Sequence, residues 1–283
     1  MRPAAAVGPP RPVPRRASGE KLFVEVVLVG REMLRGRVPD GNGNEIAAFC
    51  SQRGALVRRI TTVDDDDRAV ASAITDALNR GARLVVTAGG LGPMADDRTL
   101  AGVSDALKVP LAPHHGAKEL VEAAYRRMQS HGRASRGGVD AARENLYLLP
   151  IGAEPVENST GTAPGVIARV PGGAAVLCLP GVPAEMRAVL DAAQPALRDL
   201  APRGFVARRE VETPTSDESS LRPLLDQLSD EFPHVWVKSH AAALNDPNAR
   251  IRVTLEANST ERTEAESLVE DALRRLLSLA TAG

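Results

Sequence analysis

The chain has 283 residues, of which 43% are hydrophobic and 2% are aromatic, and its formal net charge is -1 at pH 7. This charge balance excludes a strongly basic nucleic-acid-binding protein, and the few aromatic residues argue against a surface that stacks bases. The length and apolar content allow about two domains, each with its own core. No apolar run in the sequence is long enough for a membrane span.

Residues 1–20 are rich in proline and arginine and lack the apolar core of a secretory signal. Because the prolines also prevent an amphipathic targeting helix, we expect a disordered tail here. The two cysteines, Cys50 and Cys178, occur in apolar surroundings. This indicates buried free thiols and a reducing, cytoplasmic compartment.

From residue 21 to residue 201 the hydrophobic pattern alternates between strand and helix periods. In chain order it predicts a strand at 22–30, a helix at 44–53, a strand at 55–63, a helix at 68–80, a strand at 83–87, helices at 99–108 and 114–131, strands at 146–149, 165–170 and 174–179, and a helix at 183–200. Pro171-Gly172-Gly173 predicts a tight hairpin between the last two strands. Such alternation is typical of βαβ units, so we predict a three-layer α/β domain with a mainly parallel sheet.

A second, smaller domain is predicted after the proline and glycine residues at 201–204. The pattern there gives a strand at 205–212, a helix at 218–232, strands at 235–241 and 250–257, and a helix at 260–279. This order suits an α+β domain over residues 205–283, with its helices on one face of the sheet.

The most informative motif is the loop at residues 87–99, with the sequence TAGGLGPMADDRT. It follows a strand and opens a helix, so glycine amides and the helix N-terminus can both face a bound phosphate. The carboxylates of Asp96 and Asp97 would repel a phosphate unless they hold a divalent cation or take part in chemistry. Alternatively, one of them caps the next helix, because aspartate is a preferred N-cap residue.

Three further polar loops lie at 30–44, 158–165 and 180–186, and the first and last of them follow strands. Ligands of open α/β sheets bind at the carboxyl ends of the strands, so we expect all four loops to converge on one cleft. Its carboxylates, a ligand type that suits magnesium or manganese, would be Glu32, Asp40, Asp96, Asp97 and Glu185. Turn and cap duties are the alternative for Asp40, Asn42 and Asn44. A run of four aspartates at 64–67 is interpreted mainly as a solvated helix start.

Five motifs occur together: Gly30-Arg31-Glu32, Asp40-Gly41-Asn42, Gly89-Gly90-Leu91-Gly92-Pro93 with Asp96-Asp97-Arg98-Thr99, Gly161-Thr162-Ala163-Pro164-Gly165 and Leu179-Pro180-Gly181-Val182-Pro183-Ala184-Glu185-Met186. In this order they resemble the competence/damage-inducible protein A (CinA) family. Residues 22–200 are similar to that family's molybdopterin-binding-like domain, and more distantly to the MoaB and MogA proteins of cofactor biosynthesis. Residues 205–280 resemble its smaller KH-like domain. The sequence has no counterpart of the family's amidohydrolase domain, so activity on nicotinamide mononucleotide is not expected.

The resemblance implies an α/β fold that binds a pterin phosphate, such as molybdopterin, or a nucleotide diphosphate. Some members of the family are metal-dependent pyrophosphatases that act on ADP-ribose, and a related domain hydrolyses FAD. By its place in the motif, Asp97 would be the leading catalytic or metal-binding residue, with Asp96 beside it and magnesium, manganese or cobalt as the metal. The other ligand-binding residues implied by the resemblance are Gly89, Gly90, Gly92, Thr99, Glu32, Asp40, Asn42, Gly161, Thr162, Pro180, Gly181 and Glu185.

Two functions of different classes follow from this resemblance. The first is a divalent-metal-dependent nucleotide pyrophosphatase of the ADP-ribose or FAD type. The alternative is a non-hydrolytic protein that binds molybdopterin or its precursor. It is favoured by Ala88 and Met94, which stand where the family usually has hydroxyl-bearing residues. In both cases the partner is a small-molecule phosphate ligand, with no nucleic acid and no membrane, and we expect a cytoplasmic homo-oligomer.

Overall fold

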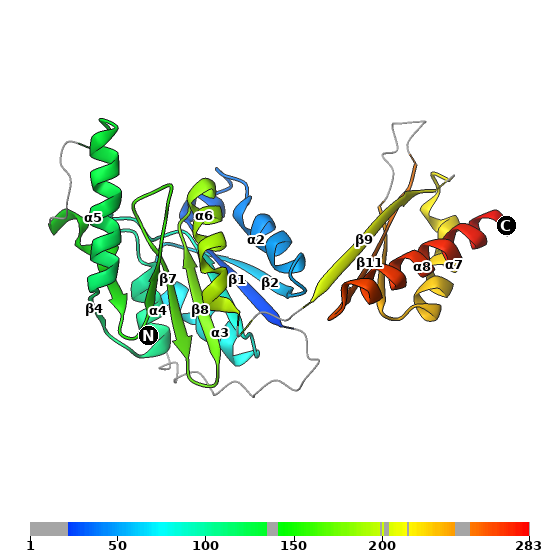
Figure 1. Ribbon diagram of the computed structural model, residues 1–283, viewed down its shortest axis with the longest axis horizontal. Helices are drawn as coiled ribbons and strands as arrows, with labels where there is room; N and C mark the ends of the chain where they lie inside the picture. The colour runs from blue at the N-terminus through cyan, green and yellow to red at the C-terminus, as the bar shows by residue number, and fades with distance from the viewer. Residues whose placement is uncertain are drawn as a thin grey trace, which may run out of the picture. The chain divides into compact units, whose positions relative to one another are not determined.

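The structure is a computed structural model that describes residues 22–134, 141–198, 200, 204–213, 215–240 and 250–282, without the side chains of 141, 142, 281 and 282. The tail predicted at 1–20 lies outside these residues. The chain divides into two compact units, residues 1–50 with 55–201 and residues 51–54 with 202–283. Figure 1 labels many of their helices and strands.

A six-stranded sheet forms the centre of the first unit, in the order β2-β1-β3-β8-β7-β6. The strands are β1 (Phe23–Val29), β2 (Leu56–Val63), β3 (Leu84–Ala88), β6 (Glu154–Val156), β7 (Gly165–Val170) and β8 (Ala174–Leu179). The first four in the sheet order are parallel, and β7 and β6 add antiparallel pairs at one side. The predicted hairpin joins β7 to β8, as its residues required.

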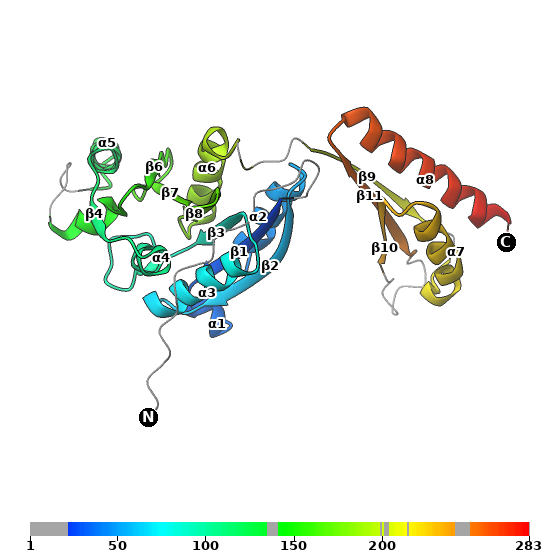
Figure 2. The same cartoon turned by 90° about the horizontal axis from the view of Figure 1, so that it is seen from below.

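Helices cover both faces of this sheet, which makes three layers (Figure 2). They are α1 (Arg31–Leu34), α2 (Asn42–Ser51), α3 (Asp67–Asn79), α4 (Thr99–Leu107), α5 (His115–Ser130) and α6 (Pro183–Ala193), with 3-10 helices η1 (Ala141–Tyr147) and η2 (Gln194–Leu197). A small two-stranded sheet pairs β4 (Leu111–Pro113) with β5 (Leu148–Pro150). The predicted three-layer α/β fold with a mainly parallel sheet is confirmed.

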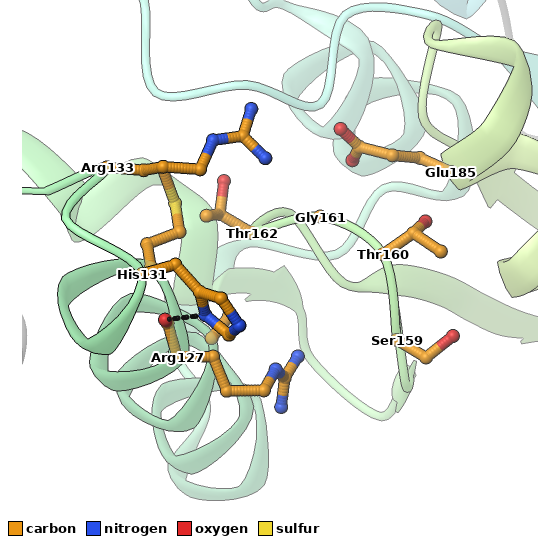
Figure 3. A pocket seen from close by; sticks show the side chains of 10 residues that line it. Arg127, His131, Arg133, Ser159, Thr160, Gly161, Thr162 and Glu185 are labelled. Carbon is orange, nitrogen blue, oxygen red and sulfur yellow. Dashed lines mark hydrogen bonds between the residues drawn. The ribbon is translucent and has the colours of Figure 1, made fainter.

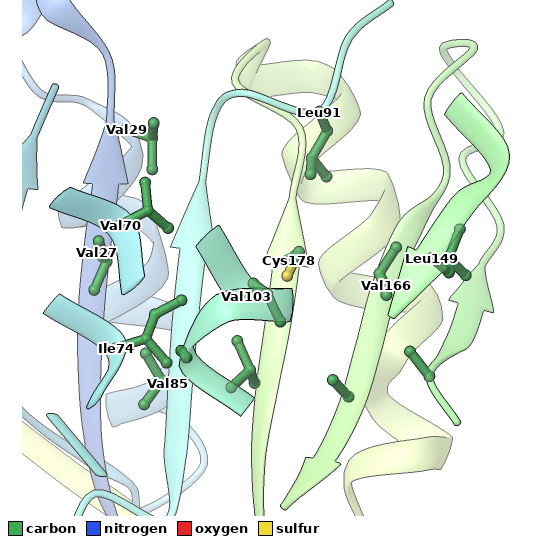
Figure 4. Packing of buried hydrophobic residues seen from close by; sticks show 14 of the residues in the cluster. Val27, Val29, Val70, Ile74, Val85, Leu91, Val103, Leu149, Val166 and Cys178 are labelled. Carbon is green, nitrogen blue, oxygen red and sulfur yellow. The ribbon is translucent and has the colours of Figure 1, made fainter. Parts of the chain in front are cut away.

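The side chains of the central strands alternate between two separate cores, because successive residues of a strand point to opposite faces. Val27 and Val29 of β1 pack with α3, α4 and α5 in one core (Figure 4). Val24, Val26 and Leu28 pack with α2 and α6 in the other. This double burial explains why the central strands read as nearly continuous apolar runs in the sequence.

Both cysteines are free thiols buried in these cores, as predicted. Burial raises the pKa of the Cys178 thiol to about 12, so this sulfur stays protonated at neutral pH and is a poor nucleophile. Over the part of the chain described, no helix combines the length and apolar character needed to cross a membrane.

The predicted helix at 183–200 was too long, because α6 ends at Ala193 and the short 3-10 helix η2 follows. Pro195 lies at the start of η2, and proline lacks the N–H that would continue an α-helical hydrogen-bond ladder. The short elements α1, β4 and β6 were not predicted at all.

The second unit is a three-stranded antiparallel sheet with two helices. Its elements are β9 (Phe205–Glu212), α7 (Glu218–Glu231), β10 (Val235–His240), β11 (Arg252–Ser259) and α8 (Arg262–Ala282), and its sheet order is β10-β11-β9. A single core buries one face of the sheet under both helices. The strand–helix–strand–strand–helix order agrees with the predicted α+β architecture, and the KH-like character of this unit stays a prediction.

Candidate functional site

The loops that follow β1, β3 and β8 lie side by side, because these strands are parallel neighbours and end at the same edge of the sheet. The amide of Gly89 donates to the carbonyl of Leu179 at 3.0 Å. A Cβ atom at Gly181 would lie 3.3 Å from the Cα of Gly89, and one at Gly89 would lie 2.2 Å from the carbonyl oxygen of Val29. Three of the predicted loops therefore meet at Gly89.

The glycine loop is held in a conformation that suits glycine and few other residues. Gly89 and Gly90 have positive φ angles of 107° and 64°, a region that side chains with a Cβ atom rarely adopt. The hydroxyl of Thr99 donates to the carbonyl of Gly89 at 2.7 Å, and its amide donates to the carbonyl of Gly90 at 3.1 Å. Thr99 is fully buried, so its side chain holds the loop from the interior of the domain.

Asp97 closes the second half of the same loop. Its Oδ2 accepts a hydrogen bond from the amide of Met94 at 2.8 Å, and a Cβ atom at Gly92 would lie 2.5 Å from that oxygen. Asp96 is exposed beside it. The N-cap residue of α4 is Arg98, and no side chain caps this helix. The alternative that Asp96 or Asp97 caps the helix is therefore wrong.

Asn42, in the region that follows β1, contacts the loop after β8 at this edge of the sheet. Its Nδ2 donates to the carbonyl of Gly181 at 2.7 Å, and its Oδ1 is buried without a hydrogen-bond partner. A buried acceptor of this kind usually has a water or a ligand as its partner. Asp40 Oδ1 accepts the amide of Gly43, three residues later, at 2.7 Å, which agrees with the turn that the sequence left open for Asp40. Glu32 lies in α1, exposed.

Arg31 interacts with acidic groups of two loops at this edge of the sheet. Its Nε lies 2.6 Å from Asp64 Oδ1, and its amide donates to Asp65 Oδ2 at 2.8 Å. Hydrogen bonding to Asp64 raises the pKa of Arg31, and Asp96 adds a weaker attraction. The same bond lowers the pKa of Asp64. Asp66 caps α3 by accepting the amide of Ala69.

Replacement of Arg31 by glutamine is expected to raise the pKa of Asp64 toward its ordinary value, because the main hydrogen bond to the carboxylate is lost. A lowered folded-state pKa stabilises the folded chain above the ordinary pKa of aspartate, and the contribution disappears as the pH falls through the lowered value. The loss of stability in Arg31→Gln should therefore be confined to higher pH. NMR titration of the Asp64 carboxyl carbon measures the shift. Arg35→Gln is the control, since Arg35 contributes least to it.

The loop before β7 is organised by Asn158, a residue that sequence reasoning did not single out. Its side chain is 4% exposed. Nδ2 donates to Ala163 O at 2.8 Å and to Glu185 Oε2 at 2.7 Å, and Oδ1 accepts the amide of Gly161 at 2.8 Å. A Cβ atom at Gly161 would lie 1.9 Å from Glu185 Oε2. The loop is thus wrapped around the Glu185 carboxylate.

A pocket of about 360 Å³ adjoins this loop (Figure 3). Gly161, Thr162 and Glu185 line it, as do three basic residues at or just after the end of α5 that the sequence analysis missed: Arg127, His131 and Arg133. Cations near the end of a helix are normally assigned to the helix dipole, and nothing local in the sequence marks these three for another role. Pro180 is buried directly after β8.

Metal binding at Asp96 and Asp97 stays a prediction. Among the residues that the structure describes, no group of three or more acidic, histidine or cysteine side chains is placed to hold a metal ion. Magnesium is often held by one or two carboxylates together with the phosphates of a substrate. Asp96 and Asp97 are the two carboxylates that such an arrangement would use.

A sequence family described as "Probable molybdopterin binding domain" matches residues 25–199. Among curated proteins, one from Aeropyrum pernix is 38% identical over 247 residues, 86% of this chain and 88% of its own length. One from Thermococcus kodakarensis is 36% identical and covers 75% of this chain and 82% of its own length.

Among solved structures, the CinA protein of unknown function from Thermoplasma acidophilum is similar to this chain, with 34% identity and a TM-score of 0.54. The match covers 64% of this chain and 98% of that one. The resemblance of the first unit to a CinA-type molybdopterin-binding domain is confirmed by these matches. The chain belongs to the molybdopterin-binding domain family.

Proposed function

We propose that the edge of the sheet around Gly89 binds a small molecule through its phosphate group, a pterin phosphate or a nucleotide diphosphate. The observation that carries the proposal is the glycine loop itself. Gly89 and Gly90 turn the backbone through positive φ angles, and the Gly90 carbonyl accepts the amide of Thr99 at 3.1 Å. This contact places the glycine turn beside the start of α4, a helix without a side-chain cap. Uncapped N-terminal amides and the positive end of the helix dipole favour a bound anion.

Two further features support a ligand at this edge. Asn42 presents a buried acceptor oxygen without a partner, which suits an amino or hydroxyl group of a pterin or a ribose. The loops after β1, β3 and β8 meet here, at the carboxyl ends of parallel strands where ligands of open α/β sheets bind.

A thermal-shift experiment tests the binding proposal. We expect molybdopterin, ADP-ribose or FAD to raise the melting temperature, because a ligand that binds only the folded chain stabilises it by mass action. Adenosine, which has no phosphate, is the matched control and should give no shift. If none of the three phosphates raises the melting temperature, with or without a divalent metal, the proposal is wrong.

Hydrolysis of a nucleotide pyrophosphate is the second candidate function. A bound magnesium, manganese or cobalt ion would neutralise charge on the phosphate and activate water. Asp97 and Asp96 would hold the ion, and amides of the glycine loop would stabilise the phosphate oxygens. The non-hydrolytic alternative is favoured by a specific contact, since Asp97 already holds the loop through the amide of Met94.

Asp97→Asn separates these two functions. The amide oxygen of asparagine can still accept the Met94 amide, so we expect the fold and the ligand-induced thermal shift to survive. If the protein is a hydrolase, AMP release from ADP-ribose should fall at least about 100-fold, the size of effect typical of lost charge stabilisation. Asp105→Asn, at an exposed position on α4, is the control. A ligand-induced thermal shift without AMP release from either ADP-ribose or FAD, with any of the three metals, would favour non-hydrolytic binding.

A further inference from the structure

The pocket next to Glu185 has two arginines on one side and a hydroxyl-bearing wall on the other (Figure 3). Arg127, His131 and Arg133 come from the end of α5 and the residues directly after it. The opposite wall is the loop at 159–162. Thr160 Oγ1 lies 3.2 Å from Asn158 Oδ1 and donates to it, and Figure 3 shows the Ser159 hydroxyl pointing away from the arginines, so Thr162 supplies the hydroxyl on this side of the pocket. Guanidinium and hydroxyl groups together are the usual donors to a phosphate or carboxylate.

Arg127 is tied to the hydroxyl-bearing wall while keeping most of its donors. Its Nη2 donates to the carbonyl of Asn158 at 3.3 Å, and a guanidinium has five N–H donors in all. Asn158 also accepts a hydrogen bond from the amide of Gly161. This one buried residue therefore contacts both sides of the pocket and fixes their relative position.

His131 presents one defined ring nitrogen to the pocket. Its Nδ1 lies 2.7 Å from the carbonyl oxygen of Arg127. A carbonyl oxygen can only accept, so Nδ1 carries the proton and donates. Figure 3 shows the other ring nitrogen, Nε2, turned toward the loop at 159–162.

Compensation of the helix dipole does not account for the whole arrangement. That effect needs cations only near the last turn of α5. It does not require Arg133, beyond the end of the helix, to line the same pocket as Arg127. The Glu185 carboxylate in this pocket is itself bound by Asn158 at 2.7 Å, and two arginines outweigh its charge.

We propose that this pocket is a second anion subsite, in which Arg127 and Arg133 bind a phosphate group with help from the hydroxyl of Thr162. Glu185 lies in the first turn of α6, four residues after Gly181, and a Cβ atom at Gly181 would lie 3.3 Å from the Cα of Gly89. The subsite therefore adjoins the glycine loop and suits a ligand with two phosphates or a phosphate and a second acidic group. The choice of phosphate as the anion rests on the proposed function.

Calorimetric titration with inorganic pyrophosphate tests the subsite. Arg133→Gln and Arg127→Gln are each expected to weaken binding at least about tenfold, because each removes a charged hydrogen-bond donor. Arg126→Gln is the matched control. Arg126 precedes Arg127 on the same helix, is exposed, and lies 3.6 Å from Glu122 outside the pocket. Its replacement should leave the affinity unchanged, and the melting temperature of each variant checks the fold.

Three outcomes would overturn the subsite: no pyrophosphate binding by the unaltered protein, equal affinity in all variants, or equal weakening in all three. Loss of pyrophosphate binding, or equal affinity in all variants, would say nothing against ligand binding at the glycine loop, which the thermal-shift experiment with molybdopterin, ADP-ribose and FAD tests separately. Gly90→Ala separates the two sites further. If this variant keeps pyrophosphate binding, and the unaltered protein shows no shift with molybdopterin, ADP-ribose or FAD, the subsite stands and the proposed function fails.

Discussion

Gly89→Ala is expected to lower the free energy of unfolding by about 3 kcal/mol and to abolish ligand binding at the sheet edge. The φ angle of 107° costs an alanine about 1–2 kcal/mol. The new Cβ atom would also lie 2.2 Å from the carbonyl oxygen of Val29, and such overpacking costs about 1–3 kcal/mol. Chemical denaturation measures the stability, and calorimetry with ADP-ribose or molybdopterin measures the binding.

Gly152→Ala is a control that separates the backbone strain from the close contact between a Cβ atom at position 89 and the Val29 carbonyl oxygen. Gly152 also has a positive φ angle, of 84°, but a Cβ atom there would meet no atom within 4 Å. Its replacement should cost only the backbone strain, about 1 kcal/mol, and should leave ligand binding intact. Equal costs in the two variants would show that the Val29 carbonyl does not determine why residue 89 is a glycine.

Local residue types were sufficient to predict the glycine loop and most of the three-layer fold. Apolar runs with strand or helix periods placed the central strands, and the bounds of β7, β8 and β9 agree with the prediction. The end of α6 was predicted too late, because the helical periodicity of Val189 and Leu190 was extended past Pro195. Proline cannot continue the hydrogen-bond pattern of an α-helix. The three-residue strands β4 and β6 depend on pairing with distant partners, so no pattern within them marks a strand.

The pocket beside Glu185 was only half predictable for a similar reason. Its loop was identified from polar and glycine residues, but the contacts that shape it join residues far apart in sequence. Asn158 bonds to Glu185 across 27 positions, and Arg127 bonds to Asn158 across 31. Periodicity describes which face of its own helix a residue occupies, and it contains no information on such partners.

Asn158→Asp is expected to destabilise the chain by about 3 kcal/mol at neutral pH. The new carboxylate can still accept the amide of Gly161, but it places an acceptor where Nδ2 now donates to Ala163 O and Glu185 Oε2. A buried acceptor left without a donor costs about 1–3 kcal/mol, and more when it is charged. The destabilisation should shrink as the pH falls, because a protonated carboxyl group can donate to its neighbour.

Glu185→Gln should rescue Asn158→Asp, and this rescue distinguishes the specific contact from general damage to the loop. In the double variant the glutamine amide donates to the new carboxylate, so the hydrogen bond between positions 158 and 185 is restored with donor and acceptor exchanged. A double-mutant cycle by chemical denaturation measures the coupling, expected at about 1–3 kcal/mol. Asn44→Asp, at an exposed position in α2, should change stability by less than about 0.5 kcal/mol. Additive effects at 158 and 185 would mean that Asn158 holds the loop through its backbone contacts alone, and that Glu185 is free to bind ligand.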